Sequence, residues 1–100
     1  MVVFHVRPAV DADRLGLSKL LHYETHVHRH LDWQAPIDWI GWSPFLVAEE
    51  GDAILAALAC PMDLPGVAWI RLFAVVDHVS YESLWDQLWS EARGYLSAQS

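Results

Sequence analysis

The stretch from Phe45 to Cys60 constrains the fold more than any other part of the sequence. Phe45 to Glu50 and Ala53 to Cys60 are two runs rich in apolar residues, and only Gly51-Asp52 separates them. A two-residue connection with glycine first is typical of a type II′ turn, whose twist suits two antiparallel strands. The sequence therefore predicts a β-hairpin, and with it a sheet on which the other elements pack.

The residues before the hairpin predict a strand and two helices. Val2 to Val6 is rich in β-forming residues and reads as a first strand that ends at Arg7-Pro8. Asp11 is placed to cap a helix from Ala12 to Val27, in which apolar residues recur at helical spacing. Proline suits the first position of a helix, so a second, short helix is expected from Pro36 to Gly41.

The residues after the hairpin predict one long strand and one long helix. Val67 to Val76 is a ten-residue run that is apolar on both faces apart from Arg71, a pattern typical of a central strand covered on both sides. Ser80 can cap the last helix. Apolar residues then recur at intervals of three and four, as in an amphipathic helix: Tyr81, Leu84, Trp85, Leu88, Trp89, Ala92 and Leu96.

The expected order is strand, helix, short helix, strand, strand, long strand, helix. A chain of 100 residues is the size of one domain. We therefore expect a single α/β (α+β) domain over residues 1–100, with a mixed, largely antiparallel sheet of about four strands and helices on both faces.

Charge and cysteine content exclude some classes of partner. The net charge is −7 with only six Lys+Arg, which disfavours binding to nucleic acids and to anionic membranes. Cys60 is the only cysteine, so no internal disulfide can form. With no signal peptide, a reducing cytoplasm is the expected location.

The order of elements and several motifs resemble the start of a GNAT-type (Gcn5-related) acetyltransferase domain. Val6-Arg7-Pro8-Ala9, followed by Asp11-Ala12-Asp13, is similar to the opening "hRxAxxxD" pattern of that family. Phe45 to Ile54 is similar to its "fLVAEedGxiv" hairpin. Val67 to Val76 and Ser80 to Ser97 stand where the family has its fourth strand and the helix after it. The resemblance covers nearly the whole chain.

The resemblance implies an acetyl-CoA site at the junction of that strand and helix. The backbone of Leu72, Phe73, Ala74, Val75 and Val76 would hold the thioester and pantetheine, and Ser80 stands where the family has Gln or Arg of its pyrophosphate loop. The chain departs from the family pattern between Asp77 and Trp85, because no glycine occurs there and Trp85 takes a glycine position. Its helical register predicts that Trp85 points inward.

The resemblance supplies no catalytic residue. The family's later strands and its fourth helix, which carry the usual base and acid, have no counterpart before Ser100. We therefore expect either a homo-oligomer or a C-terminal half supplied by a longer protein.

His22, His26, His28 and His30 form the only candidate metal cluster. His22 and His26 are four residues apart, the spacing of a metal-binding pair on one helix face. The string is not H-E-x-x-H, and histidines near a helix C-terminus also interact favourably with the helix dipole. The dipole interpretation is favoured, and no metal is expected.

Three further features each have a functional and a structural interpretation. Trp33, Trp39 and Trp42 could form an aromatic wall for a small amine, or pack a thin core or a dimer surface. Arg71 needs a partner if it is buried, and Glu49 or Asp63 is expected. Cys60 is expected to be a small buried apolar residue.

Two functions remain open from the sequence. One is an N-acetyltransferase that transfers acetyl from acetyl-CoA to an unidentified amine, by direct attack of the amine on the thioester. The other is a non-catalytic module that self-associates through an exposed sheet edge formed by its long strand.

Overall fold

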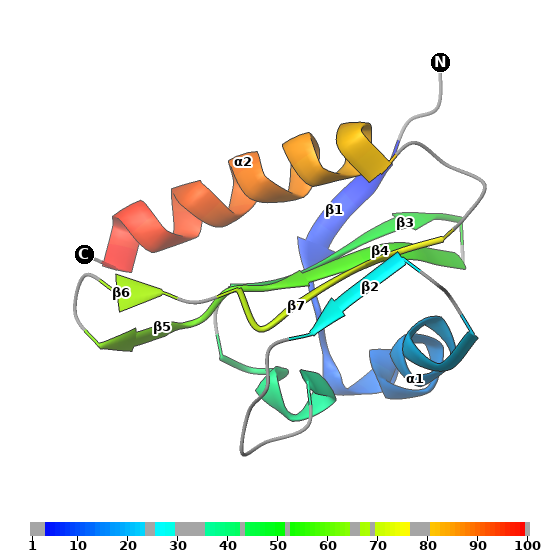
Figure 1. Ribbon diagram of the computed structural model, residues 1–100. Helices are drawn as coiled ribbons and strands as arrows, with labels where there is room; N and C mark the ends of the chain where they lie inside the picture. Colours follow the sequence, from blue (N-terminus) through cyan, green and yellow to red (C-terminus); the bar gives the residue numbers. More distant parts are fainter. Residues whose placement is uncertain are drawn as a thin grey trace.

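The hairpin lies at the centre of a five-stranded sheet with the order β1-β3-β4-β7-β2 (Figure 1). The computed structural model describes residues 4–23, 26–29, 36–42, 44–51, 53–64, 67–68, 70–76 and 81–99. Strands β3 (Phe45–Glu50) and β4 (Ala53–Ala59) pair antiparallel. Gly51 between them has a φ of 61°, a conformation that glycine adopts without steric cost. The predicted hairpin is confirmed.

Strand β1 (His5–Pro8) forms one edge of the sheet and pairs antiparallel with β3. The predicted end of the first strand is wrong, because Arg7 and Pro8 belong to it; Val2 and Val3 lie outside the described residues. Proline is tolerated in an edge strand when its missing N–H faces away from the neighbouring strand.

The first helix is shorter than predicted. A 3-10 turn η1 (Asp11–Asp13) leads into α1 (Arg14–Tyr23), and β2 (His26–Arg29) replaces the expected last helical turn. The predicted helix end at Val27 is therefore wrong. All four residues of β2 pair with β7, and a distant strand that satisfies backbone groups can override local helix preference.

The predicted long strand from Val67 to Val76 is divided in two. β6 (Val67–Ala68) pairs with β5 (Met62–Leu64) in a separate two-stranded sheet, whereas β7 (Leu72–Val75) joins the main sheet. β7 lies between β4 and β2, so its predicted central position is confirmed and the prediction that the long strand is an exposed edge is wrong.

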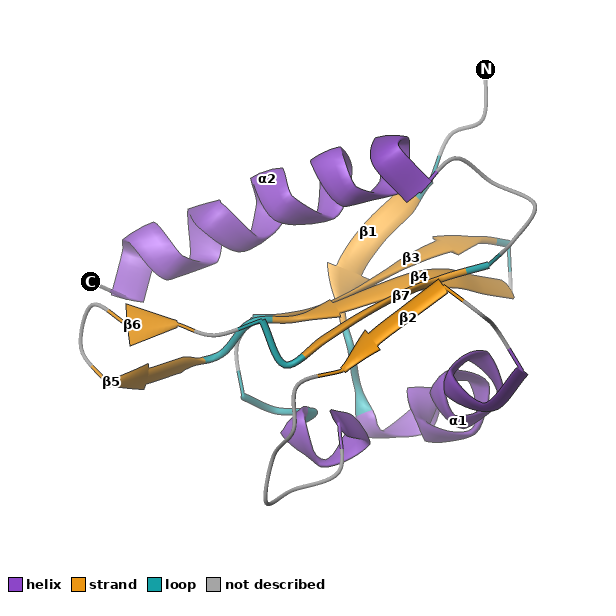
Figure 2. Ribbon diagram, viewed as in Figure 1, coloured by secondary structure: helices purple, strands orange, loops and turns teal. Residues whose placement is uncertain are grey.

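Helices cover both faces of the main sheet (Figure 2). The long helix α2 (Tyr81–Gln99) crosses one face, while α1 and the 3-10 turn η2 (Pro36–Trp39) lie on the other. η2 corresponds to the short helix predicted from Pro36 to Gly41, with an earlier end. Two apolar clusters fill these layers. The first, under α2, contains Leu46, Leu58, Val75, Leu84 and Leu88. The second, on the side of α1, contains Leu17, Leu20, Val47, Ala57 and Leu72.

The predicted fold class, with helices on both sides of a largely antiparallel sheet, is confirmed. The sheet has five strands rather than about four, because no strand was expected at β2, whose first two residues were assigned to the helix. Each strand pairing within the described ranges is antiparallel, so the sheet there is not mixed.

Candidate functional site

The strand that the resemblance assigns to acetyl-CoA is paired on both sides. β4 lies along one side of β7 and β2 along the other. The N–H of Val76, directly after the strand, donates to the carbonyl oxygen of Leu55 at 2.9 Å. Backbone groups of an antiparallel strand point alternately to its two neighbours. Leu72 and Ala74 therefore also point to β4, whereas Phe73 and Val75 point to β2.

Of the predicted cofactor positions that the structure describes, only two thus have backbone groups on the side away from β4. These are Phe73 and Val75, and β2 occupies that side. A ligand that pairs with the backbone of β7 must therefore displace β2. Ser80, the last predicted cofactor position, lies outside the described residues.

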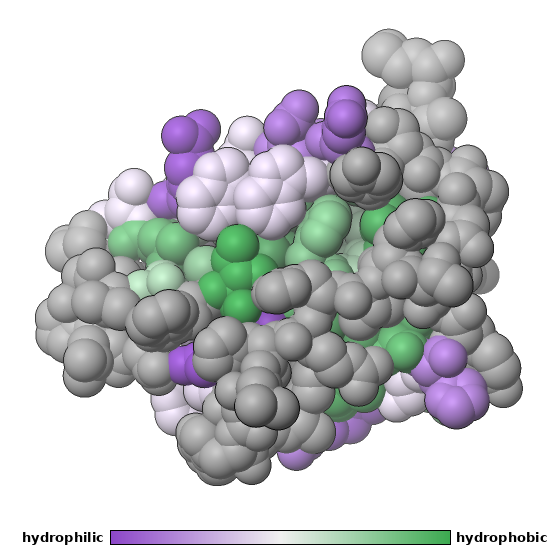
Figure 3. Space-filling view, viewed as in Figure 1, coloured by the Kyte–Doolittle hydropathy of each residue, from purple (hydrophilic) through white to green (hydrophobic). Residues whose placement is uncertain are grey.

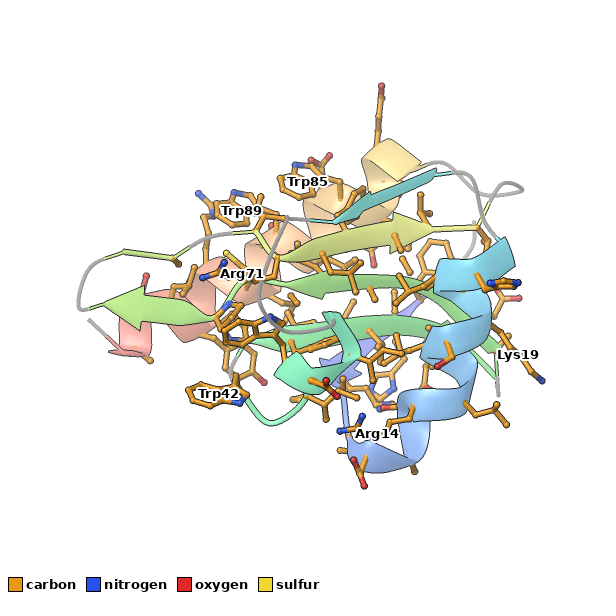
Figure 4. The ribbon with its side chains drawn as sticks, turned by 60° about the horizontal axis from the view of Figure 1, so that its bottom comes forward. Arg14, Lys19, Trp42, Arg71, Trp85 and Trp89 are labelled. Carbon is orange, nitrogen blue, oxygen red and sulfur yellow. The ribbon has the colours of Figure 1, made fainter. Side chains whose placement is uncertain are left out.

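Trp85 packs on the sheet, as its helical register predicts. Its ring meets Phe73 edge to face, with centroids 5.2 Å apart, and stacks on Trp89 at 5.6 Å with an interplanar angle of 5°. Figure 4 shows both tryptophans projecting from α2 on the same side. On the face seen in Figure 3, hydrophobic surface lies below α2. The two indoles remain half-buried, so this corner of the molecule is apolar.

Arg7, in the first motif of the resemblance, binds two carboxylates. Its Nη1 and Nη2 donate to Asp13 Oδ2 and Oδ1, each at 2.8 Å. Its Nη2 also donates to Glu49 Oε2 at 3.0 Å, and His5 Nδ1 lies 3.1 Å from Glu49 Oε1. The network therefore joins the "hRxAxxxD" motif to the hairpin motif. The sequence did not identify this pairing, since Glu49 was considered, with Asp63, as a partner of Arg71.

These contacts shift the pKa values of the acids. The hydrogen bonds from Arg7 lower the pKa of Asp13, and a hydrogen bond from the Val10 N–H at 2.8 Å lowers it further against the effect of burial. Hydrogen bonds from Arg7 and then His5 lower the pKa of Glu49. Asp11, the predicted cap, instead accepts a hydrogen bond from Arg14 Nε at 2.6 Å. Asp13 accepts the hydrogen bond from the backbone N–H of Val10 that stabilises the start of η1.

A surface cavity of about 610 Å³ lies beside this network, between α1 and the hairpin. Arg7, Asp13, Lys19 and Glu49 provide its charged groups, and Ile54 is among its apolar ones. Lys19 projects away from α1 (Figure 4). Because Arg7 and its two carboxylates engage one another, the network supports the junction of β1, β3 and η1.

The candidate metal pair His22 and His26 does not lie on one helix. His22 lies on α1 and His26 on β2, so the two residues are not one turn apart on a helix. Among the described residues, no three His, Cys, Asp or Glu side chains are grouped as metal ligands. His30 lies outside the described residues, as do the side chains of His26 and His28.

The buried Arg71 lies against an aromatic ring. Its guanidinium carbon is 5.0 Å from the ring centroid of Trp39, and Trp39 meets Trp42 edge to face at 5.6 Å. Trp39 is buried and Trp42 is exposed, while Trp33 and the side chain of Asp63 lie outside the described residues. Trp39 thus packs in the core, as the structural interpretation expected. A cation over an indole face is an attractive contact, which the sequence analysis did not consider for Arg71.

Cys60 is buried, as predicted, and burial raises the pKa of its thiol. A thiol in this state is a poor nucleophile.

No family model matches this chain, and no curated protein or solved structure matches it either. None of the helices within the described ranges has the length and apolar character needed to cross a lipid bilayer.

Proposed function

We propose that this chain is a GNAT-like N-acetyltransferase domain, or a fragment of one, that binds acetyl-CoA beside β7. The Arg7 network carries the proposal, because it links Asp13 and Glu49, one residue from each stretch on which the resemblance rests. The spatial order β1-β3-β4-β7-β2, with α2 the next described element after β7 in the chain, also supports the proposal, because the resemblance puts the cofactor where such a strand is followed by a helix.

The proposed reaction is direct acetyl transfer. The nitrogen of an amine attacks the thioester carbonyl carbon, the carbon–sulfur bond breaks, and coenzyme A leaves as its thiol after the nitrogen gives up a proton. The backbone N–H groups of Phe73 and Val75 would polarise the carbonyl and align the pantetheine arm. No described residue is assigned as the base, and a C-terminal half in a longer protein is the proposed source of one. The sole cysteine suits a cytoplasmic location.

Isothermal titration with acetyl-CoA tests this proposal. We expect saturable heat and shifts of the Phe73 and Val75 amide resonances in an NMR titration. Coenzyme A and free acetate serve as controls, because the first keeps the pantetheine arm and the second lacks it. Absence of heat and of amide shifts at millimolar acetyl-CoA would overturn the proposal.

A second candidate is a non-catalytic module that self-associates. The observation that favours it is the pairing of β7 on both sides, which fills the place proposed for the cofactor. Because β7 is internal, the outer edge of β2 would be the contact between copies. Sedimentation velocity at tens of micromolar should then give a dimer that Val27→Pro disrupts, because the N–H of Val27 faces away from β7, and a clean monomer would contradict this candidate.

A further inference from the structure

The outer side of β1 offers unpaired backbone groups to a partner. Within the described part of the chain, β1 pairs with β3 alone. The Ala9 N–H donates to the Phe45 carbonyl oxygen at 2.7 Å, and by alternation the backbone groups of Val6 and Pro8 point away from β3. Pro8 has no N–H, and its oxygen accepts from Arg7 Nη1 at 3.1 Å. A partner strand can therefore pair at Val6 and at the preceding Phe4, but not at Pro8.

A groove runs beside these groups, between β1 and α2. A cavity of about 540 Å³ is bordered by Phe4 and Val6 on the strand side and by Asp86 and Glu91, among others, on the helix side. Both carboxylates are exposed. An unpaired strand edge thus lies next to two negative charges.

An aromatic cleft lies further along the same two elements. This smaller cavity, of about 120 Å³, is bordered by Pro8, Pro44, Trp42 and Tyr95, among others. Trp42 and Tyr95 are large apolar residues that are 58% and 36% exposed.

The two cavities follow one another along both elements, and their spacings agree. From Phe4 to Pro8 an extended strand rises about 13 Å, and from Asp86 to Tyr95 a helix rises about 14 Å. The cavities therefore lie in line along the two elements, one bordered by carboxylates and the other by aromatic rings, and we call the pair the β1–α2 track.

We infer that the β1–α2 track binds an extended, cationic segment of a partner protein, which adds to β1 as an antiparallel strand. The backbone of the segment pairs with Phe4 and Val6. Its lysine or arginine side chains contact Asp86 and Glu91. An aromatic residue near its N-terminal end fills the cleft between Trp42 and Tyr95. Such strand addition draws affinity from main-chain hydrogen bonds and specificity from side-chain sites.

The net charge of the chain favours a cationic partner protein over a second copy of this chain. The net charge of −7 attracts a cationic segment, whereas two copies repel each other over the range of their fields. The inference is independent of acetyl-CoA binding, since β1 and β7 are separated in the sheet by β3 and β4.

The test uses the full chain and a capped probe peptide, Trp-Thr-Val-Thr-Val-Lys-Lys. Fluorescence anisotropy should give saturable binding that weakens as salt increases, and NMR should place amide shifts at Phe4 and Val6. A peptide with both lysines replaced by glutamate and a peptide with N-methylated valines should each bind at least about tenfold more weakly, because one loses the charge and the other the backbone donors.

Variants of the protein locate the site. Glu91→Lys and Trp42→Ala should each weaken binding at least about tenfold. Glu50→Lys is the matched control, because it changes the net charge equally at an exposed position that borders neither cavity. Equal losses for Glu91→Lys and Glu50→Lys would overturn the inference. So would undiminished binding of the N-methylated peptide, or sedimentation that shows copies of the chain pairing through β1.

Discussion

Arg7 and Glu49 lie 42 residues apart in the chain, yet the guanidinium of Arg7 contacts the Glu49 carboxylate twice, at 3.0 Å from Nη2 to Oε2 and at 3.0 Å from Nε to Oε1. The same guanidinium binds Asp13 at the start of η1. The side chain of Arg7, in the edge strand β1, therefore links β1 to the hairpin and to η1.

Arg7→Ala should lower the free energy of unfolding by about 1–2 kcal/mol, because the buried Asp13 keeps its charge and loses its charged donor. Urea unfolding followed by circular dichroism measures this change. Arg14→Ala is the matched control, since Arg14 also meets two carboxylates, Asp11 and Asp38, but is well exposed. It should leave the unfolding midpoint unchanged. Equal effects of the two substitutions would contradict a structural role for the Arg7 network.

Stability should fall in acid more steeply in the wild-type protein than in Asp13→Asn. Arg7 holds the pKa of Asp13 below its ordinary value of 3.8 and that of Glu49 below 4.5. The ionised acids therefore stabilise the folded state fully above those ordinary values, and this contribution is lost as the pH falls through the lowered pKa values.

Urea midpoints measured between about pH 5 and pH 2 test this difference, because Asp13→Asn removes one of the two titrating groups. The variant should be less stable near neutral pH and should lose less stability across this range. Parallel pH profiles of the two proteins would show that Asp13 does not contribute.

Gly16 lets α1 lie close to β4, since a Cβ atom at this position would be 3.1 Å from Ile54 Cδ1. Alanine gains about 1 kcal/mol in helix propensity, and the terminal methyl group of the partly exposed Ile54 can rotate away, so Gly16→Ala should change stability by less than about 0.5 kcal/mol. Gly16→Val crowds the same contact with two more methyl groups and should cost about 1–3 kcal/mol. Thermal unfolding that gives both variants the same midpoint would contradict this close packing.

Local signals in the sequence predicted the local structure. The turn at Gly51 and the apolar runs on both sides of it predict the hairpin from neighbouring residues alone. The spacing of Leu84, Leu88 and Ala92 predicts α2. Fold class and the position of helices on both faces follow from the order of these elements.

Non-local pairing could not be predicted in the same way. Val27 continues the helical spacing of α1, yet its segment forms β2 because β7 offers backbone partners from a distant part of the chain. In the apolar run from Val67 to Val76, Arg71 alone interrupts the pattern between β6 and β7, and one charge does not predict a division of the strand. The pairing of Arg7 with Glu49 also depends on which strands become neighbours. The sequence analysis therefore named both residues but did not predict that they contact each other.

The relation between β2 and β7 allows the most direct test of the proposed acetyl-CoA site. Alternation directs the backbone groups of His28 toward Phe73 and those of Val27 away from β7. His28→Pro should therefore weaken β2 and free the side of β7 proposed for the cofactor, whereas Val27→Pro removes an N–H that faces away from β7. Circular dichroism checks that both variants are folded.

Acetyl-CoA titration of these two variants and of the wild-type protein, followed at the Phe73 and Val75 amides, is the decisive measurement. The proposal predicts binding that is several-fold tighter in His28→Pro than in Val27→Pro or the wild-type protein. Absence of binding to folded His28→Pro, or shifts that avoid Phe73 and Val75, would contradict it.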